Sequence, residues 1–256
     1  MPIRPIAALR ALAFARVVLA LVPLGCASKP PTGGPGTYRG VLAGVTEIGT
    51  VEVTVEEAGS GLLPASGTIN LASTVVSLSG TLDQSNASLS LASTDGYQLA
   101  GISRPTYVFG SFQDPQDSGS FALFLESASS SPIRLFCGSF IDTSSTGSFP
   151  SSTFPFGVTA TPSGLAFCVS PGFTWFGALD ASDTLSCQSG SGAFFGNTDA
   201  DGGNQWGTGV DNQGNGDYGT WTLAPCGGGA SDASADGRSD SGPDAGVTGS
   251  ADGEVD

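Results

Sequence analysis

Carboxylate and amide side chains gather in one unusual stretch of the sequence, Asn197 to Asp217. Within it, Asp199 and Asp201 lie two residues apart and are followed by turn glycines and the amide of Asn204. A calcium-binding loop of the EF-hand kind begins with oxygen ligands at this spacing. The closing Glu and the flanking helices of such a loop are missing, so a solvated turn of Asx and Gly residues is the alternative. The sequence therefore leaves a structural calcium ion open and indicates no other cofactor.

Two aromatic residues, Trp206 and Tyr218, lie within and next to this stretch. Aromatic side chains are frequent anchors at binding surfaces, where a flat ring can pack against a sugar or a peptide. They also close the ends of barrels as core residues. We therefore take Trp206 and Tyr218 as candidate contacts for a glycan or protein ligand, with a core position as the alternative.

Catalysis has little support in the composition. The chain of 256 residues contains no His, so neither a Ser-His-Asp nor a Cys-His arrangement can be built, and the usual zinc ligand is absent. Asp142, Asp180 and Asp183 could act as the paired carboxylates of a glycosidase, but no spacing marks them for that role. We predict a non-catalytic protein with a binding or structural role, and keep a secreted carbohydrate-active hydrolase as the alternative.

Four of the five cysteines fall in the second half of the chain, at Cys137, Cys168, Cys187 and Cys226. An even set in an exported, loop-rich module indicates two disulfides. Cys168 and Cys187 flank a strand expected over residues 173–179. Among the three pairings that four cysteines allow, we therefore favour Cys168 with Cys187 and Cys137 with Cys226.

Residues 1–25 have the features of a signal peptide. Arg4, Arg10 and Arg16 make the start positive, and residues 17–24 form a short apolar run. A spanning helix needs about 20 apolar residues, so this run predicts a cleaved leader and no membrane span.

The end of this leader, Leu24-Gly25-Cys26, resembles the lipobox of a bacterial lipoprotein precursor. The resemblance implies that Cys26, the one cysteine without a disulfide partner, receives the lipid and anchors the protein in the cell envelope. Ala27 after the cysteine is similar to lipoproteins that are sent on to the outer membrane. Ordinary secretion is the alternative, because Gly25-Cys26-Ala27 also fits a small-x-small cleavage site before Ser28.

Three short segments recur in the same order along the chain, at offsets of 98, 97 and 100 residues. The pairs are 38–42 with 136–140, 80–85 with 177–182, and 119–123 with 219–223. Such a period predicts a duplicated module of roughly 90 residues.

Alternation of apolar and polar residues predicts β-strands in both modules. Val51, Val53 and Val55, for example, alternate with polar residues, which is typical of a half-buried strand. Turn signals recur about every 8 to 12 residues, the rhythm of a sandwich or barrel. We therefore expect an all-β protein with two related antiparallel modules. Its expected divisions are a signal peptide (1–25), a tether (26–36), a first module (37–127), a linker (128–132), a second module (133–226) and a tail (227–256).

The charge distribution limits the partners. The net charge of −15 argues against nucleic acid, whose phosphates need a basic face. Residues 227–256 contain seven Asp or Glu against one Arg and almost no apolar bulk, so we expect a disordered acidic tail. The membrane, reached through a lipid anchor, and a glycan or protein ligand are the partners that we expect.

Overall fold

The protein is described by a computed structural model of residues 31–59, 61–127, 131–143, 152–189, 192–198, 204–208 and 218–227. The expected leader, the expected lipid-attachment residue Cys26 and the expected acidic tail after Gly227 lie outside these residues. So do residues 128–130 of the expected linker.

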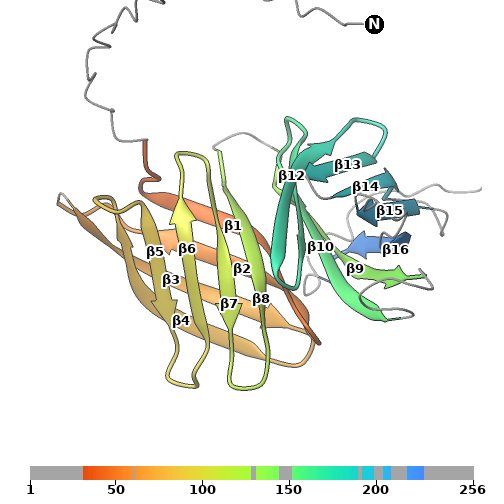
Figure 1. Cartoon of the computed structure of the whole chain (residues 1–256). Coiled ribbons are helices and arrows are strands. Elements are labelled where there is room, and N and C mark those ends of the chain that lie inside the picture. The colour runs from red at the N-terminus through yellow and green to blue at the C-terminus, as the bar shows by residue number, and fades with distance from the viewer. Residues whose placement is uncertain are drawn as a thin grey trace, which may run out of the picture. The chain divides into compact units, whose positions relative to one another are not determined.

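The described chain forms two closed antiparallel barrels of eight strands each, joined in chain order (Figure 1). The first consists of β1 (Gly36–Gly44), β2 (Ile48–Val55), β3 (Leu62–Leu71), β4 (Val75–Asp83), β5 (Ser88–Ala92), β6 (Gln98–Ser103), β7 (Tyr107–Gln113) and β8 (Ser118–Leu125). The second consists of β9 (Arg134–Asp142), β10 (Thr153–Ala160), β11 (Leu165–Ser170), β12 (Phe173–Leu179), β13 (Thr184–Ser189), β14 (Gly192–Asn197), β15 (Asn204–Thr208) and β16 (Tyr218–Pro225). The predicted all-β fold with two antiparallel modules is confirmed, and each module is a barrel.

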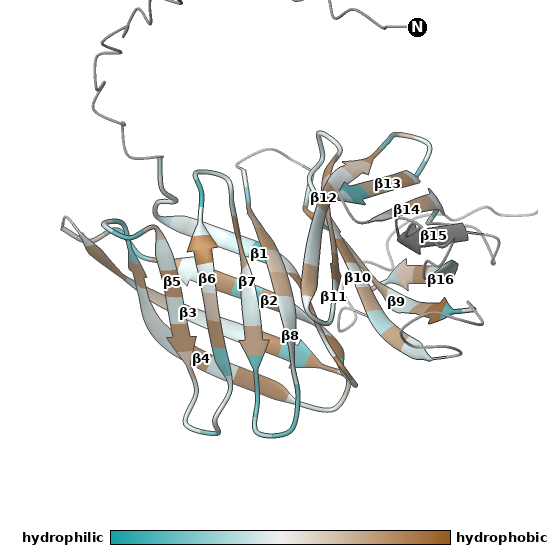
Figure 2. Ribbon diagram, viewed as in Figure 1, coloured by the Kyte–Doolittle hydropathy of each residue, from teal (hydrophilic) through white to brown (hydrophobic). Residues whose placement is uncertain are grey.

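Each barrel closes because its first strand pairs with its last, β1 with β8 and β9 with β16. Closure leaves no free strand edge, and edges are where β proteins aggregate. Figure 2 shows apolar segments on the strands of both barrels and hydrophilic colours at many of the turns between them. The side chains that point inward form one core in each barrel.

The interiors of the two barrels differ in kind. Aliphatic residues dominate the first, among them Val51, Val53 and Val55, which are at most 2% exposed. Aromatic rings dominate the second, where Phe156 and Phe194 stack with their ring centroids 4.4 Å apart. Such rings bury large areas and fill the interior.

The two barrels also share their strand register. Gly40 lies opposite Leu123 in the first, and Gly138 lies opposite Leu223 in the second. A Cβ at either glycine would overlap a backbone oxygen of the last strand, of Ala122 or Thr222 respectively. Glycine is therefore required at this point of both barrels, because its lack of a Cβ lets the strands approach.

The three segments that recur in the sequence occupy equivalent places. They lie on the first, fourth and eighth strands of each barrel, and the two fourth-strand segments run on into the following turn. Gly80 and Gly177, on the fourth strands, are a second matched pair, because a Cβ at either would overlap a backbone oxygen of the fifth strand.

A third apolar cluster lies where the two barrels meet. It joins Val41 and Phe124 on the outer faces of β1 and β8 to Phe167 and Val169 on β11. The rings of Phe124 and Phe167 lie 5.0 Å apart. These strands are buried on both faces, so their sequences contain continuous apolar runs such as residues 121–125 of β8.

Both predicted disulfides are confirmed. Cys168–Cys187 lies inside the second barrel, where both residues are fully buried, and connects β11 to β13. Cys137–Cys226 connects β9 to the end of β16 across 89 residues of sequence. The first bridge braces the core, and the second holds the chain end of the barrel to its first strand.

Candidate functional site

The stretch 197–217, interpreted from the sequence as the start of a calcium-binding loop or as a solvated turn, contains a strand, because Asn204–Thr208 forms β15. The prediction of a loop is wrong for these five residues. The backbone of Trp206 pairs with Phe194 on one side and with Gly219 on the other. Phe112 has the matching register in the first barrel, opposite Leu99 and Gly119. The missed signal is the strand count. The first barrel has eight strands, and a second barrel of the same kind requires a strand between β14 and β16.

Tyr218, the other candidate ligand contact, is the first residue of β16 and is 56% exposed. Its carbonyl oxygen accepts a hydrogen bond from the backbone N–H of Thr143, 2.9 Å away. The ring is therefore held on a strand and stands in solvent, as a binding contact requires.

The expected calcium ligands are only partly described. Asp199 and Asp201 lie outside the described residues, and Asn204 is the first residue of β15. The described residues include no group of three or more His, Cys, Asp or Glu that could hold a metal ion. A calcium site at Asp199 and Asp201 stays a prediction.

Of the three carboxylates considered for acid–base chemistry, Asp180 and Asp183 share the turn between β12 and β13, where the backbone N–H of Asp183 donates to the carbonyl oxygen of Asp180 at 3.1 Å, and Asp142 lies far from both. Asp183 forms an ion pair with Arg134 at the start of β9, with Nη1 and Oδ1 2.5 Å apart. Asp142 lies eight residues further along that strand, about 26 Å away at the strand rise of 3.3 Å. It is 1% exposed, at the opposite end of the barrel.

Asp180 is engaged in the turn between β12 and β13. Its Oδ1 accepts hydrogen bonds from the backbone N–H groups of Thr184 (2.9 Å) and Ser182 (2.8 Å) and from the Ser182 hydroxyl (2.8 Å). The bonds from Thr184 and Ser182 lower the pKa of Asp180. A carboxylate held ionised in this way stabilises a turn and is a poor general acid.

An acidic hollow at one end of the first barrel was not foreseen in the sequence. It has a volume of about 260 Å³, and its charged residues come from three different turns: Glu47, Asp95, Asp114 and Asp117. Burial raises the pKa of Glu47, and the negative charges of Asp114 and Asp117 raise it further. The turns could be recognised in the sequence, but which of them meet depends on barrel closure.

Asp117 is the structural centre of this hollow. Its carboxylate accepts hydrogen bonds from the backbone N–H groups of Val45, Thr46 and Glu47 at 2.8, 2.9 and 3.2 Å. Burial tends to raise the pKa of Asp117, but the hydrogen bonds from Thr46, Val45 and Ser118 prevail and lower it. The ionised carboxylate therefore fixes the hairpin between β1 and β2.

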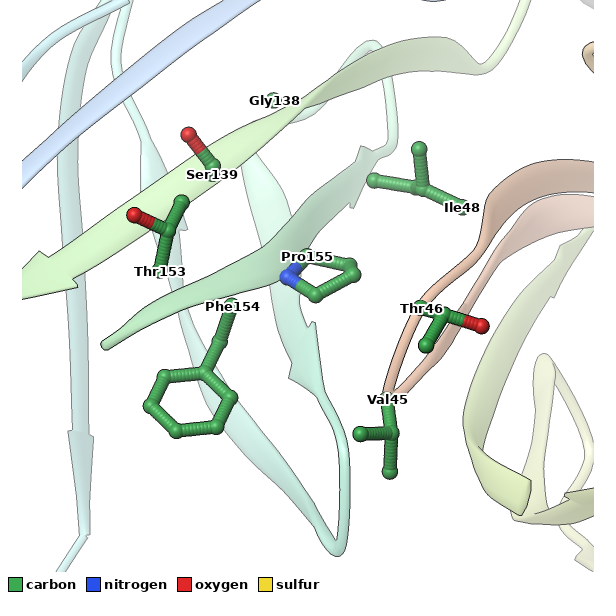
Figure 3. A pocket seen from close by; sticks show the side chains of 8 residues that line it. All are labelled: Val45, Thr46, Ile48, Gly138, Ser139, Thr153, Phe154 and Pro155. Atoms are coloured by element: carbon green, nitrogen blue, oxygen red, sulfur yellow. The ribbon is translucent and has the colours of Figure 1, made fainter. Parts of the chain in front are cut away.

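That hairpin borders a groove of about 410 Å³ against the second barrel (Figure 3). The groove is lined by Val45, Thr46, Ile48, Gly138, Ser139, Thr153, Phe154 and Pro155. Three hydroxyl side chains and several apolar ones line it, and none of the eight residues is charged. It can hold a small uncharged group, but it offers no acid, base or nucleophile apart from these hydroxyls.

No protein-family model matches the chain, and neither a curated protein nor a solved structure matches it. No helix in the described part of the chain has the length and apolarity that crossing a membrane requires. Function is therefore inferred from the residues of this chain.

Proposed function

We propose that this chain is an exported, lipid-anchored protein of the cell envelope, with a non-catalytic binding or structural role. The observation that carries the proposal is the pairing of all four cysteines of the second barrel in disulfides. Structural disulfides persist in oxidising compartments outside the cytoplasm. Cys26 is then the only cysteine left without a disulfide partner, which fits attachment of a lipid to its thiol.

The way the chain enters the first barrel supports an anchor close to the folded body. The backbone N–H of Gly33 donates to the buried hydroxyl of Ser103 at 3.0 Å, and the Tyr38 hydroxyl donates to the carbonyl oxygen of Gly34 at 2.8 Å. Gly33 is the seventh residue after Cys26, and seven residues reach at most about 25 Å. A lipid on Cys26 would hold the first barrel within that distance of the bilayer.

The distribution of carboxylates supports binding over catalysis. Asp117 and Asp180 bind turn backbone, and Asp183 pairs with Arg134. Side chains fill the cores of both barrels, and these three carboxylates already have partners within the protein. The outer surface is therefore the part of the protein that can bind a ligand.

Membrane fractionation of the full chain and of Cys26→Ser, expressed with the natural leader in a Gram-negative host, tests the proposal. We expect the unaltered chain in the membrane fraction, labelled by a fatty acid supplied to the cells, and Cys26→Ser unlabelled. Cys137→Ser is the matched control, because it breaks the Cys137–Cys226 disulfide, leaves Cys26 unchanged and should leave the label in place. An unlabelled, soluble exported protein would support ordinary secretion in place of lipid anchoring.

A further inference from the structure

An apolar patch lies on the outer surface at the place where the two barrels meet, and we call it the junction patch. Three of its members are large and exposed: Ile102 on β6 (44%), Leu165 on β11 (45%) and Phe176 on β12 (44%). Tyr107 and Phe109 on β7 are partly exposed. Both barrels already have filled cores, so a continuous apolar patch outside them indicates a contact surface.

The patch is continuous from the first barrel to the second. Ile102 and Phe109 are register partners on β6 and β7. The rings of Phe109 and Tyr107 lie 6.1 Å apart. The Tyr107 ring in turn lies 5.9 Å from the Phe176 ring of the second barrel. These four side chains therefore form one surface across the junction.

Leu165 extends this surface along the second barrel. It pairs with Ala178, and Phe167 pairs with Phe176, so these four side chains share one face of β11 and β12. Phe167 is buried beneath the patch, with its ring 4.7 Å from that of Phe176 and 5.0 Å from that of Phe124 in the first barrel. The junction patch is thus the solvent-facing border of the apolar contact between the barrels.

The tether enters the first barrel beside this patch. Ser103, whose hydroxyl accepts the hydrogen bond from Gly33, directly follows Ile102 in the sequence. The turn between β6 and β7 lies at the end of the barrel where the chain enters (Figure 1). A lipid on Cys26 would therefore hold the bilayer within about 25 Å of the point where the junction patch begins.

The charges favour a bilayer over a second copy of the chain. Two copies with a net charge of −15 each repel one another. The strand neighbours of the exposed members are uncharged, Ser88 beside Ile102 and Ala178 beside Leu165. Arg104 begins the turn next to the patch, where its long side chain can reach a lipid phosphate. Aromatic and aliphatic side chains favour the boundary between headgroups and acyl chains.

We propose that the junction patch docks on the surface of a zwitterionic bilayer, with Ile102, Leu165 and Phe176 at the boundary between headgroups and acyl chains. The inference rests on the proposed lipid anchoring, which brings the bilayer within reach of the patch. A short tether makes the contact intramolecular, so a patch too small to bind a free membrane can still orient the anchored protein.

Quenching of an added Trp by brominated phosphatidylcholine tests the proposal. The chain contains no His, so residues 26–256 with Cys26→Ser and an N-terminal histidine tag can be held on vesicles by a nickel-chelating lipid alone. The signal is the fluorescence that Ile102→Trp adds to that of the same chain without the new Trp. We expect it to fall by about half on lipids brominated near the headgroup end of the acyl chain.

Val75→Trp is the matched control, because Val75 is 69% exposed at the other end of the same barrel and should keep its added fluorescence. In the Ile102→Trp chain, Leu165→Asp and Phe176→Ser should each abolish the quenching. Far-UV circular dichroism checks that each of these variants is folded.

The proposal is overturned if Ile102→Trp is not quenched, or if Val75→Trp is quenched to the same extent. It is also overturned if both Leu165→Asp and Phe176→Ser leave the quenching unchanged. Self-association in sedimentation that is lost in these two variants would overturn it in favour of a contact between copies. The histidine tag replaces the lipid, so none of these outcomes depends on acylation of Cys26, and the anchoring proposal keeps its own test.

Discussion

The two barrels have the same strand count, order and register but different interiors. At one pair of matched interior positions the first barrel has Gly67 near Leu91, and the second has the Cys168–Cys187 disulfide. A Cβ at Gly67 would lie only 2.9 Å from the carbonyl oxygen of Glu52 and 3.3 Å from Leu91 Cδ1. The first barrel is closely packed at this point, while the second joins the same two strands by a covalent bond.

The difference shows that backbone pairing and matched glycines define this fold, while the side chains that fill it can change in kind. Strands β11 and β12 have 6 and 7 residues, against 10 and 9 in β3 and β4. The second barrel therefore has less pairing between its third and fourth strands. Its disulfides and aromatic rings offset that loss.

Reducing both disulfides should give the largest effect and should separate the two barrels. For bridges that close 19 and 89 residues of sequence, loss of the chain constraint corresponds to about 3 and 5 kcal/mol of unfolding free energy. All three Trp residues lie in the second barrel, so Trp fluorescence reports on it alone. We expect reductant to lower the midpoint of the fluorescence transition strongly, while a large part of the far-UV circular dichroism unfolds later. Loss of both signals together at the original midpoint would contradict this difference between the barrels.

Substitution of the matched glycines tests the shared register. Gly40→Ala and Gly138→Ala should each cost about 1 to 3 kcal/mol, because the new Cβ would overlap a backbone oxygen of the last strand. Chemical denaturation of both variants measures the cost. Gly34→Ala is the control, since a Cβ there meets nothing within 4 Å. Equal stability of all three variants would mean that the glycines do not set the close approach of the strands.

Replacing Asp117 by Asn should weaken the first barrel by about 1 to 2 kcal/mol at neutral pH, because three partly buried N–H groups lose a charged acceptor. The folded pKa of Asp117 is lowered, so its stabilisation is complete above the unfolded pKa and is lost as pH falls through the folded pKa. We expect the unaltered chain to lose stability below about pH 4 and Asp117→Asn to show a flatter profile there. Asp180→Asn, on an exposed turn of the second barrel, should have a smaller effect. Parallel pH profiles for Asp117→Asn and the unaltered chain would rule out this role.

Glu47→Gln should give the smallest effect and the opposite sign. Burial and the nearby Asp114 and Asp117 raise the pKa of Glu47, so its charged form weakens the folded state above that pKa. Thermal unfolding at pH 7 should show a gain of about 0.5 kcal/mol or less. A loss of stability would indicate that the Glu47 charge has a favourable partner.

Alternation of apolar and polar residues marks the strands that face water on one side, whereas strands buried on both sides lack it. Val51, Val53 and Val55 alternate because one face of β2 is solvated, whereas Val41, Leu42 and Ala43 are all buried between a core and the neighbouring barrel. The disulfides could be predicted because Cys168 and Cys187 flank one strand, which leaves Cys137 to pair with Cys226. Closure of the barrels could not, since it depends on pairs nearly 90 residues apart.

The candidate site was only partly visible for the same reason. Tyr218 could be identified from the sequence because it follows the stretch 197–217 directly. Phe195, by contrast, follows Phe194, and only the strand register shows that Phe194 points inward and Phe195 outward. Asp117 sits in a recognisable turn, yet its partners Val45 and Thr46 are about 70 residues away in sequence. Local patterns predict elements, while sites assembled from distant strands require the fold.

Intact-mass analysis of the protein from its natural membrane, with and without reduction before thiol alkylation, tests the central claim most directly. The predicted result is a chain that begins at Cys26 and carries added acyl mass, with four cysteines that react only after reduction. A chain that lacks acyl mass and has four thiols open to alkylation without reductant would contradict both the exported location and the braced second barrel.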